Sequence, residues 1–435
     1  MAPPIIGLLA IAILLVLIMF RMWIGVAMGL VGIVGLVILK GFDSTFVQLA
    51  DVPFTNINSF TLTVVPMFTL MGMVIAESKI GSGLFGACNA WLGRRHGGLA
   101  SATVVTSGLL GAITGSHLVG TVILSKVALP EMKRYKYEEG FASAAVAVGA
   151  PLSIIIPPSL PLIIYGIITS QEISKLFISG IIPGIIMILV FIGIIVVTCK
   201  RNPEKAPRAE MRLKLGEKLR ATWGVVPVLV LFIVVLGGVY AGVFTTTESG
   251  AIGSVGAILI SISYKAINGK KFLQAVKETA MTLGMLFTML MGTYIFIRFM
   301  TFSQLPQAIS TFLVGLGAPL PLMMLALAIL YILLGMFMPE IPMIILTVPV
   351  LFPGLQAIGF DPIWLGMFLV LMMALGAITP PIGMIVFLVS GLSKVPVPKL
   401  FKAVSPFVIG DLIVILLICV FPVLVTWLPS LMKLT

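Results

Sequence analysis

The chain has 435 residues, of which 60% are hydrophobic and only 10% are charged, and its mean hydropathy is +1.21. A soluble domain is about 45–50% apolar and about 25% charged, so this composition excludes a soluble globular protein and indicates an integral membrane protein. The net charge of +12 comes from Lys and Arg in short segments between apolar runs, which is the positive-inside pattern of membrane proteins and not a sign of nucleic-acid binding.

The apolar runs are predicted to be helical spans, so the expected fold class is all-α. Each run is continuous over roughly 17–25 residues, the length of one helical crossing, whereas the strands of an outer-membrane barrel alternate polar and apolar residues. The chain begins MAPP, without the basic segment of a signal peptide, and we expect its first run to be a retained helix. Cys88, Cys199 and Cys419 lack metal-site spacing and are expected to pack in the core.

Residues 1–60 are predicted to form N-terminal scaffold helices. Apolar spans are expected at 5–20 and 23–39, and a polar loop at 41–60. Residues 61–199 are predicted to form a first repeat, which opens with a span around 63–76.

Residues 98–130 are predicted to form a re-entrant helical hairpin. Basic clusters flank this apolar run on both sides, and Thr114-Gly115-Ser116-His117 interrupts it. Because both ends are basic, both should face the cytoplasm, which a single crossing does not allow. Gly, Ser and Thr in the middle of the run suit the tip of a hairpin. The alternative is an ordinary span with one misplaced cluster of charges.

Residues 143–166 are predicted to form a discontinuous helix. The segment is apolar enough to cross a bilayer, but Pro151, Pro157, Pro158 and Pro161 break it. Proline removes a backbone donor and clashes with the preceding turn. Broken backbone persists at membrane depth only where protein buries it or where it lines a cavity. The segment is therefore a candidate ion or substrate site.

The middle of the chain is predicted to connect the two halves. Residues 200–222 carry many charges and are typical of an amphipathic connector on the cytoplasmic surface, and residues 223–277 should form further scaffold helices. Glu248 resembles an ion ligand, but Thr246 or Thr247 before it favours a helix N-cap with an acid in the first turn.

Residues 278–435 are predicted to form a second repeat. It should contain a span at 281–299, a hairpin at 320–353 and a discontinuous helix at 363–391. The two halves share a spacing: Gly115 lies 42 residues before Pro157, and Met338 lies 42 residues before Pro380. The tripeptide Lys-Leu-Phe follows each proline pair. One shared feature could arise by chance, but several in one order favour an inverted-repeat transporter with its binding site between the halves.

Motifs along most of the chain resemble the large membrane subunit of tripartite ATP-independent periplasmic (TRAP) transporters. They are PMFTLMG at 66–72, GGLASATV at 97–104, GAITGSH at 111–117, IIPPSLPLIIYG at 155–166, KLFISGIIPG at 175–184, TESGAIG at 247–253, GMFMPEIP at 335–342 and TPPIG at 379–383. The chain differs from the family pattern at His117, where Ser is usual, and at Pro339, where an acid is usual and Glu340 follows one residue later. It also has Ala150-Pro151-Leu152-Ser153 where a glycine-richer run is usual.

The resemblance implies an elevator-type fold of the ion-transporter superfamily with sodium as the coupling ion. It also implies three partners: a small four-helix membrane subunit of the DctQ type, a periplasmic substrate-binding protein, and an organic acid, either a carboxylate or a sulfonate. The expected location is the cytoplasmic (inner) membrane of a bacterium or archaeon, as a multi-pass protein in the lipid bilayer.

Two sodium sites are expected at the breaks. Sodium is a hard cation that takes oxygen ligands, and unwound backbone offers carbonyls with partial negative charge. The first site is predicted where one tip faces the first broken helix, at Thr114, Gly115, Ser116, Gly149, Pro151 and Ser153. The second is predicted at Gly335, Met338, Thr379, Pro380 and Gly383. Close helix packing explains any one of these small residues equally well.

The organic acid is expected to bind between the tips, where helix N-termini supply donors. The candidate residues are Ser116, His117, Ser153, Ser159, Glu340 and Thr379. His117 could donate to the acid, cap the tip or carry a proton. Glu340 is the other ionisable group expected at membrane depth.

An enzyme is not predicted. The chain has two histidines and scattered acids, and it lacks HExxH and GxSxG. An ATP-driven pump is disfavoured because GxxxxGK[ST] is absent. A stand-alone ion-coupled transporter or antiporter of the same superfamily, without a binding protein, is the alternative.

Overall fold

The computed structural model describes residues 2–78, 80–115, 117–207, 214–223, 225–315, 317 and 319–432, apart from the side chains of residues 52–54. Within these ranges all regular elements are helices. Seven helical segments are long and apolar enough to cross a membrane, or eight if the bent pair α13 (Leu215–Trp223) and α14 (Val226–Tyr240) counts as one span. The chain is therefore an all-α, multi-pass membrane protein, as its composition predicts.

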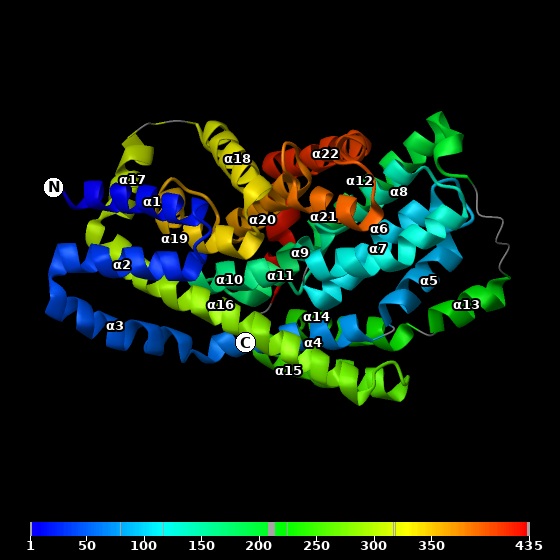
Figure 1. Ribbon diagram of the computed structural model, residues 1–435, viewed down its shortest axis with the longest axis horizontal. Helices are drawn as coiled ribbons and strands as arrows, with labels where there is room; N and C mark the ends of the chain where they lie inside the picture. The colour runs from blue at the N-terminus through cyan, green and yellow to red at the C-terminus, as the bar shows by residue number, and fades with distance from the viewer. Residues whose placement is uncertain are drawn as a thin grey trace.

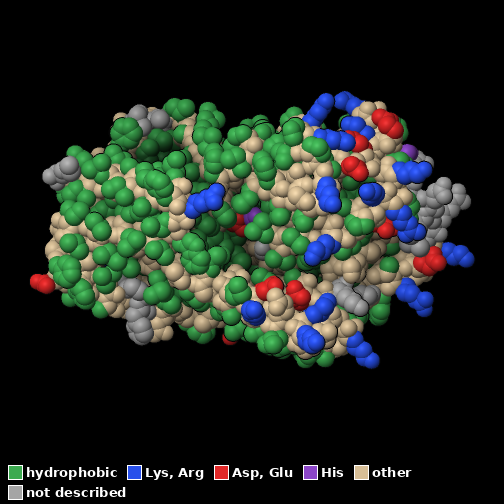
Figure 2. Space-filling model, in the orientation of Figure 1, with side chains coloured by type: hydrophobic (Ala, Val, Ile, Leu, Met, Phe, Trp, Pro, Cys, Tyr) green, Lys and Arg blue, Asp and Glu red, His purple; other side chains and the backbone are tan. Residues whose placement is uncertain are grey.

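The outer helices present apolar side chains to their surroundings. On α1 (Pro3–Met19) and α2 (Ile24–Lys40), Leu8 is 61% exposed and Ile38 62% exposed. In Figure 2 hydrophobic side chains dominate the left half of the face. Such a surface is unfavourable in water, whereas lipid tails are as apolar as leucine and accommodate it.

The predicted polar loop at 41–60 is wrong, because α3 (Phe42–Ile57) is a helix packed on α2 and α16 (Gly269–Ser303). Its polar Thr45 is buried and donates a hydrogen bond to the Gly41 carbonyl at 2.7 Å. Phe42 and Phe46 instead point outward and are exposed. Polar residues of this helix, among them the exposed Asp43 and Asp51, lower its hydropathy, and this made the segment look like a loop.

A close crossing of α2 and α16 joins the N-terminal helices to the second half of the chain. A Cβ built on Gly292 would lie 1.8 Å from the Gly25 carbonyl oxygen, so only glycine permits this approach. Helix α16 has 35 residues and begins well before the predicted span at 281–299. Helix α4 (Val64–Glu77) packs on α16, and α15 (Thr246–Ser263) packs on α4.

Glu248 serves as a helix cap, as predicted, but the capping residue is Thr245 and not Thr246 or Thr247. The Thr245 hydroxyl accepts from the Glu248 amide at 3.2 Å, and the Glu248 carboxylate accepts from the Thr245 amide at 2.8 Å. This reciprocal pair is a capping box.

Two helical hairpins enter the molecule from opposite ends. The first consists of α6 (Gly98–Thr114) and α7 (His117–Arg134), and the second of α18 (Leu320–Phe337) and α19 (Glu340–Ala357). In Figure 1 the first lies in the right half and the second in the left half, and they approach each other near the middle. Gly115 has a φ of +60°, a left-handed conformation that suits glycine at the first tip.

Both proline-containing segments are broken helices. The first consists of α8 (Glu139–Gly149), α9 (Leu152–Ile155) and α10 (Leu160–Thr169), and the second of α20 (Pro362–Ile378) and α21 (Met384–Ser393). Helices α10 and α21 have 10 residues each, and each is followed by a left-handed residue, Ser170 or Lys394. The two halves therefore share their breaks in structure as well as in sequence.

The remaining helices complete the bundle and are α5 (Ile80–Leu92), α11 (Ile173–Ser179), α12 (Ile181–Arg201), α17 (Leu305–Gly315), α22 (Val397–Val420) and α23 (Val423–Ser430). Two short 3-10 turns lie at Phe60–Thr63 and Pro203–Lys205. Of the predicted connector at 200–222, residues 208–213 lie outside the described residues, and its C-terminal part forms α13. The division of the chain into scaffold and repeats stays a prediction.

Basic side chains gather at one end of the molecule. Figure 2 shows Lys and Arg at the right-hand end, where Figure 1 places α5, α8, α12 and α13, and few at the left-hand end. This asymmetry supports a cytoplasmic location for the right-hand end.

Candidate functional site: the meeting of the two hairpin tips

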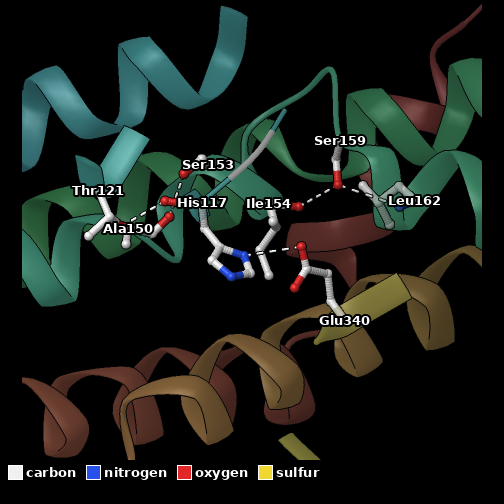
Figure 3. A network of polar contacts seen from close by, with 8 residues as sticks. All are labelled: His117, Thr121, Ala150, Ser153, Ile154, Ser159, Leu162 and Glu340. Atoms are coloured by element: carbon white, nitrogen blue, oxygen red, sulfur yellow. Dashed lines mark hydrogen bonds and ion pairs between the residues drawn. The ribbon is translucent and has the colours of Figure 1, made fainter. Parts of the chain in front are cut away.

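The two hairpin tips are joined by an ion pair at the centre of the molecule. His117 begins α7 and Glu340 begins α19, directly after their tips. The distance between His117 Nδ1 and Glu340 Oε1 is 3.1 Å, and the two side chains are only 3% and 14% exposed. Figure 3 shows the imidazole and the carboxylate pointing toward each other from separate elements. Two predicted substrate-binding residues are thus brought into contact.

His117 and Glu340 occupy equivalent positions in the two halves. His117 lies 40 residues before Pro157, and Glu340 lies 40 residues before Pro380. Two equivalent positions of a duplicated structure can touch only close to the axis that relates the copies. The equivalence therefore predicts that the ion pair lies close to the pseudo-twofold axis of an inverted repeat.

The hydroxyl groups around the pair are engaged with the backbone. Thr121 donates to the His117 carbonyl at 2.7 Å, and Ser153 donates to the Ala150 carbonyl. Ser159 donates to the Ile154 carbonyl at 2.6 Å and accepts from the Leu162 amide at 3.4 Å, which caps α10. Figure 3 shows these contacts beside His117. The Ser159 hydroxyl thus satisfies a carbonyl at the first break, whereas the Thr121 hydroxyl bonds back to the preceding turn of its own helix.

One polar atom of the site stands apart from these contacts. His117 Nε2 is buried and has no hydrogen-bond partner among the described residues. A buried polar atom without a partner is costly, and its presence in a native structure points to a ligand or an exchangeable proton.

The described residues of the predicted first sodium site lie at the ends of α6, α8 and α9. A Cβ built on Gly115 would lie 3.0 Å from the Pro158 carbonyl oxygen, so this tip touches the first break. Gly149 instead packs on Ser107, and the Thr114 carbonyl faces Gly72 of α4. Ser116 lies outside the described residues. Pro151 and Ser153 lie at α9, beneath α6.

Residues of the predicted second sodium site lie on both sides of the second break. A Cβ built on Gly383 would lie 3.0 Å from the Thr379 carbonyl oxygen, and Pro380 lies between them and is exposed. Gly335 lies within α18, where it packs on Gly376, and Met338 caps that helix. In the described part of the chain no group of three His, Cys, Asp or Glu gathers. A cation at either break would therefore take carbonyl and hydroxyl oxygens, a donor set that fits sodium.

Two small residues at the breaks were missed by the sequence analysis. A Cβ built on Gly111 would lie 2.1 Å from Ser153 Cα, and one built on Gly376 would lie 2.9 Å from Gly335 Cα. They hold each hairpin against its broken helix. Gly111 is the first residue of the motif GAITGSH at 111–117, so the sequence did point to it. Spacing alone, however, does not show which glycine touches which element.

A separate cavity of about 920 Å³ lies away from the tips. Its lining combines the α10–α11 connection with the α14–α15 connection and includes Gln171, Glu172, Thr245 and Glu248. It contains none of the predicted site residues.

Paired hairpins that meet at broken helices are typical of membrane transport proteins. The fold is similar to that of the YdaH transporter of Alcanivorax borkumensis, with a TM-score of 0.55, 14% identity and 99% of both chains covered. It is also similar to MtrF of Neisseria gonorrhoeae, with a TM-score of 0.60 and 15% identity over 89% of this chain and 85% of that one. At such identities these likenesses concern the fold.

Sequence comparison identifies the family. The family model described as "Tripartite ATP-independent periplasmic transporter, DctM component" matches residues 11–424. The chain belongs to this family. The sialic acid TRAP transporter large permease protein SiaM of Vibrio cholerae is 29% identical, with 90% of this chain and 94% of that one covered. The C4-dicarboxylate TRAP transporter large permease protein DctM of Pseudomonas aeruginosa is 30% identical over 88% of both chains. These relatives are named as permease subunits and not as enzymes, which confirms the prediction.

Proposed function

We propose that this chain is the large permease subunit of a sodium-coupled TRAP transporter that imports an organic acid across the cytoplasmic membrane. A periplasmic binding protein delivers the acid, and a small four-helix membrane subunit completes the complex. The observation that carries the proposal is the meeting of two oppositely oriented hairpin tips at paired broken helices.

The substrate class follows from the charge of the helix ends. Helices α7 and α19 both begin at the His117–Glu340 pair, so two positive dipole ends converge there. Helix N-termini favour anions. The names of relatives include sialic acid, C4-dicarboxylate and isethionate, all of which carry a carboxylate or sulfonate.

The elevator movement is supported by two kinds of packing. The hairpins and broken helices pack on one another through backbone contacts at Gly111 and Gly376, which suits a module that moves as one body. The crossing of α2 and α16 is a further close contact, and α16 also packs on α19 of the second hairpin. The cavity lined by the α10–α11 and α14–α15 connections offers space beside this module.

The test is uptake by proteoliposomes that contain this chain, its small subunit and an excess of binding protein loaded with its acid. We expect uptake only with an inward sodium gradient, and none when the binding protein is omitted. Equal uptake in potassium would reject sodium coupling, and uptake without the binding protein would favour the stand-alone transporter.

Thr379→Val should raise the sodium concentration for half-maximal uptake about tenfold, since a lost oxygen ligand is worth about 1.4 kcal/mol. Thr301→Val is the matched control, because both hydroxyls donate to the carbonyl four residues earlier while Thr301 is exposed on α16. Ser116→Ala should act in the same direction as Thr379→Val. An unchanged sodium dependence in both site variants would count against the predicted sites.

A further inference from the structure

We propose that a basic pocket between the α5–α6 turn and α13 binds the phosphate headgroup of an anionic phospholipid in the cytoplasmic leaflet. The bound lipid fastens α13, which precedes the second half of the chain, to α5 in the first half. The inference goes beyond the proposed function, because neither the organic acid nor sodium takes part in it.

The pocket has the composition of an anion site. Its volume is about 420 Å³, and its lining consists of Trp91, Arg94, Arg95, His96 and Lys218. Cavities that hold small ligands typically measure about 300–1,000 Å³. Two guanidinium groups and one ammonium group belong to this lining, and no acidic residue of the described chain does. Such a concentration of one sign of charge attracts an anion.

The α5–α6 turn holds the two arginines at the surface. The Gly98 amide donates to the Arg95 carbonyl at 2.8 Å. Gly97 has a φ of +71°, and a Cβ at this position would lie 2.6 Å from Cys199 Sγ. The end of α12 therefore packs directly against the turn, while Arg94 and Arg95 are exposed.

Helix α13 supplies the third cation. Trp91 Nε1 donates to Thr222 Oγ1 at 2.8 Å, and Lys218 Nζ lies 5.6 Å from the centre of the Trp91 ring, within the range of a cation–π contact. Lys218 and Thr222 are four residues apart, so one face of α13 packs on α5. These contacts hold the ammonium group in the same pocket as the arginines.

The positive charges of the pocket lack acidic partners. Within the described ranges Arg94, Arg95 and Lys218 take part in no ion pair. Glu217 is the acid next to Lys218 in the sequence, but its carboxylate accepts from the Lys214 amide at 2.7 Å. Like charges around one cavity repel each other, and a bound anion offsets this repulsion. Because guanidinium groups pair with phosphate oxygens through two parallel hydrogen bonds, phosphate suits these donors.

An apolar stripe on α13 indicates that the phosphate belongs to a lipid. Leu215, Leu219 and Trp223 recur every four residues on one face of the helix, and all three are exposed. A soluble phosphate would fill only the pocket and leave this stripe in water, whereas acyl chains cover it. Trp91 is exposed as well, and tryptophan rings gather at the level of lipid headgroups.

The pocket lies at the end of the molecule that we expect in the cytoplasm. Figure 1 places α5 and α13 together at the right-hand end, and the two helices pack on each other. Figure 2 shows Lys and Arg gathered at the same end. The cytoplasmic leaflet carries anionic lipids, and basic pockets between helices on this side are typical headgroup sites.

Amide hydrogen exchange of α13 tests the inference. The sample is the complex of this chain with its small subunit, stripped of lipid in a neutral detergent, and the probes are phosphatidylglycerol, phosphatidylcholine and glycerol phosphate. With phosphatidylglycerol at about ten times its Kd, exchange of residues 215–223 should slow about tenfold, because a ligand of the docked helix shifts the opening equilibrium by this factor. Phosphatidylcholine and glycerol phosphate at the same concentration should leave it unchanged.

Removal of the three charges should abolish this selectivity. Arg94→Gln, Arg95→Gln and Lys218→Gln together should raise the phosphatidylglycerol concentration for half-maximal slowing about a hundredfold, since each basic group contributes about a factor of five. Arg94→Lys, Arg95→Lys and Lys218→Arg together keep the charge and should restore most of the slowing. This second variant separates loss of the lipid from loss of the fold.

The matched control removes the same charge elsewhere. Lys200→Gln, Arg220→Gln and Lys270→Gln together change exposed residues that do not line the pocket, and phosphatidylglycerol should slow α13 as in the unaltered chain. An equal loss of slowing in this control would overturn the inference, because net charge alone would then explain the effect.

Three further results would overturn the inference. Equal slowing by phosphatidylcholine would show that acyl chains bind without help from the basic pocket. Equal slowing by glycerol phosphate would assign the pocket to a soluble phosphate. Exchange of α13 that is already slow in the lipid-free complex and that no probe changes would show that the small subunit covers the stripe.

Discussion

Two aspartates, one exposed at a helix end and one buried within a helix, show how differently one residue type can serve a membrane helix. Asp361 precedes α20, and its Oδ1 accepts from the Trp364 amide at 2.8 Å, which caps the helix. Asp411 lies in the middle of α22 with 3% exposure, and its Oδ2 has no hydrogen-bond partner in the described part of the chain. The first carboxylate stabilises its helix, and the second is costly where it lies.

Opposite effects on stability are therefore expected at these two positions. Asp361→Ala should lower the free energy of unfolding by about 1 kcal/mol through loss of the cap. Asp411→Val should raise it by about 1–3 kcal/mol, because an unpartnered buried polar group is removed. Thermal unfolding of the purified protein in detergent measures both. A lower melting temperature for Asp411→Val would mean that the carboxyl has a partner or ligand in the membrane.

At the residue scale, sequence reasoning found the members of the tip pair but not their contact. His117 and Glu340 were candidates because ionisable residues at membrane depth are rarely accidental. Their contact depends on how two distant hairpins are related by an axis, and neither local sequence encodes that relation. The sodium ligands stay predictions, since carbonyl oxygens at a break belong to every residue type and leave no mark on the sequence.

At the level of elements, the hairpins and broken helices were predictable because their signals are local. Proline and glycine change the backbone at their own positions. The breaks near Gly115, Pro157 and Pro380 therefore lie where the sequence predicts them. Helix α3 was missed because its polar residues, including the exposed Asp43 and Asp51, lower the hydropathy of the segment. The start of α16 was missed because its first turns are polar and basic although they continue the same helix.

The contact of α6 with the first broken helix should tolerate no added methyl group. Gly111→Ala places a Cβ 2.1 Å from the Ser153 backbone, so we expect a loss of about 1–3 kcal/mol in stability and a matching loss of uptake. Gly193→Ala in α12 is the control, since nothing lies within 4 Å of its Cβ and a gain of about 0.5–1 kcal/mol is expected. Thermal unfolding and uptake would both be measured. Equal stability of the two variants would show that α6 and α9 are not held this closely.

At the scale of the whole molecule, the inverted arrangement predicts from which side of the membrane each hairpin enters. The first hairpin should begin and end at the cytoplasmic face, and the second at the opposite face. Single cysteines at His96, Lys133 and Gln356 in a protein without its three native cysteines would report this to an impermeant thiol reagent. We expect labels at 96 and 133 from one side and at 356 from the other. Labelling of 96 and 133 from opposite sides would rule out the first re-entrant hairpin.

The predicted position of the tip pair close to the pseudo-twofold axis constrains the history of the gene. In a duplicated chain whose copies are still identical, the residue at this place meets its own duplicate, so both sides of the contact carry the same residue type. A histidine opposite a glutamate became possible only once the copies had drifted apart. The complementary contact at the centre of the molecule is thus younger than the duplication that built it.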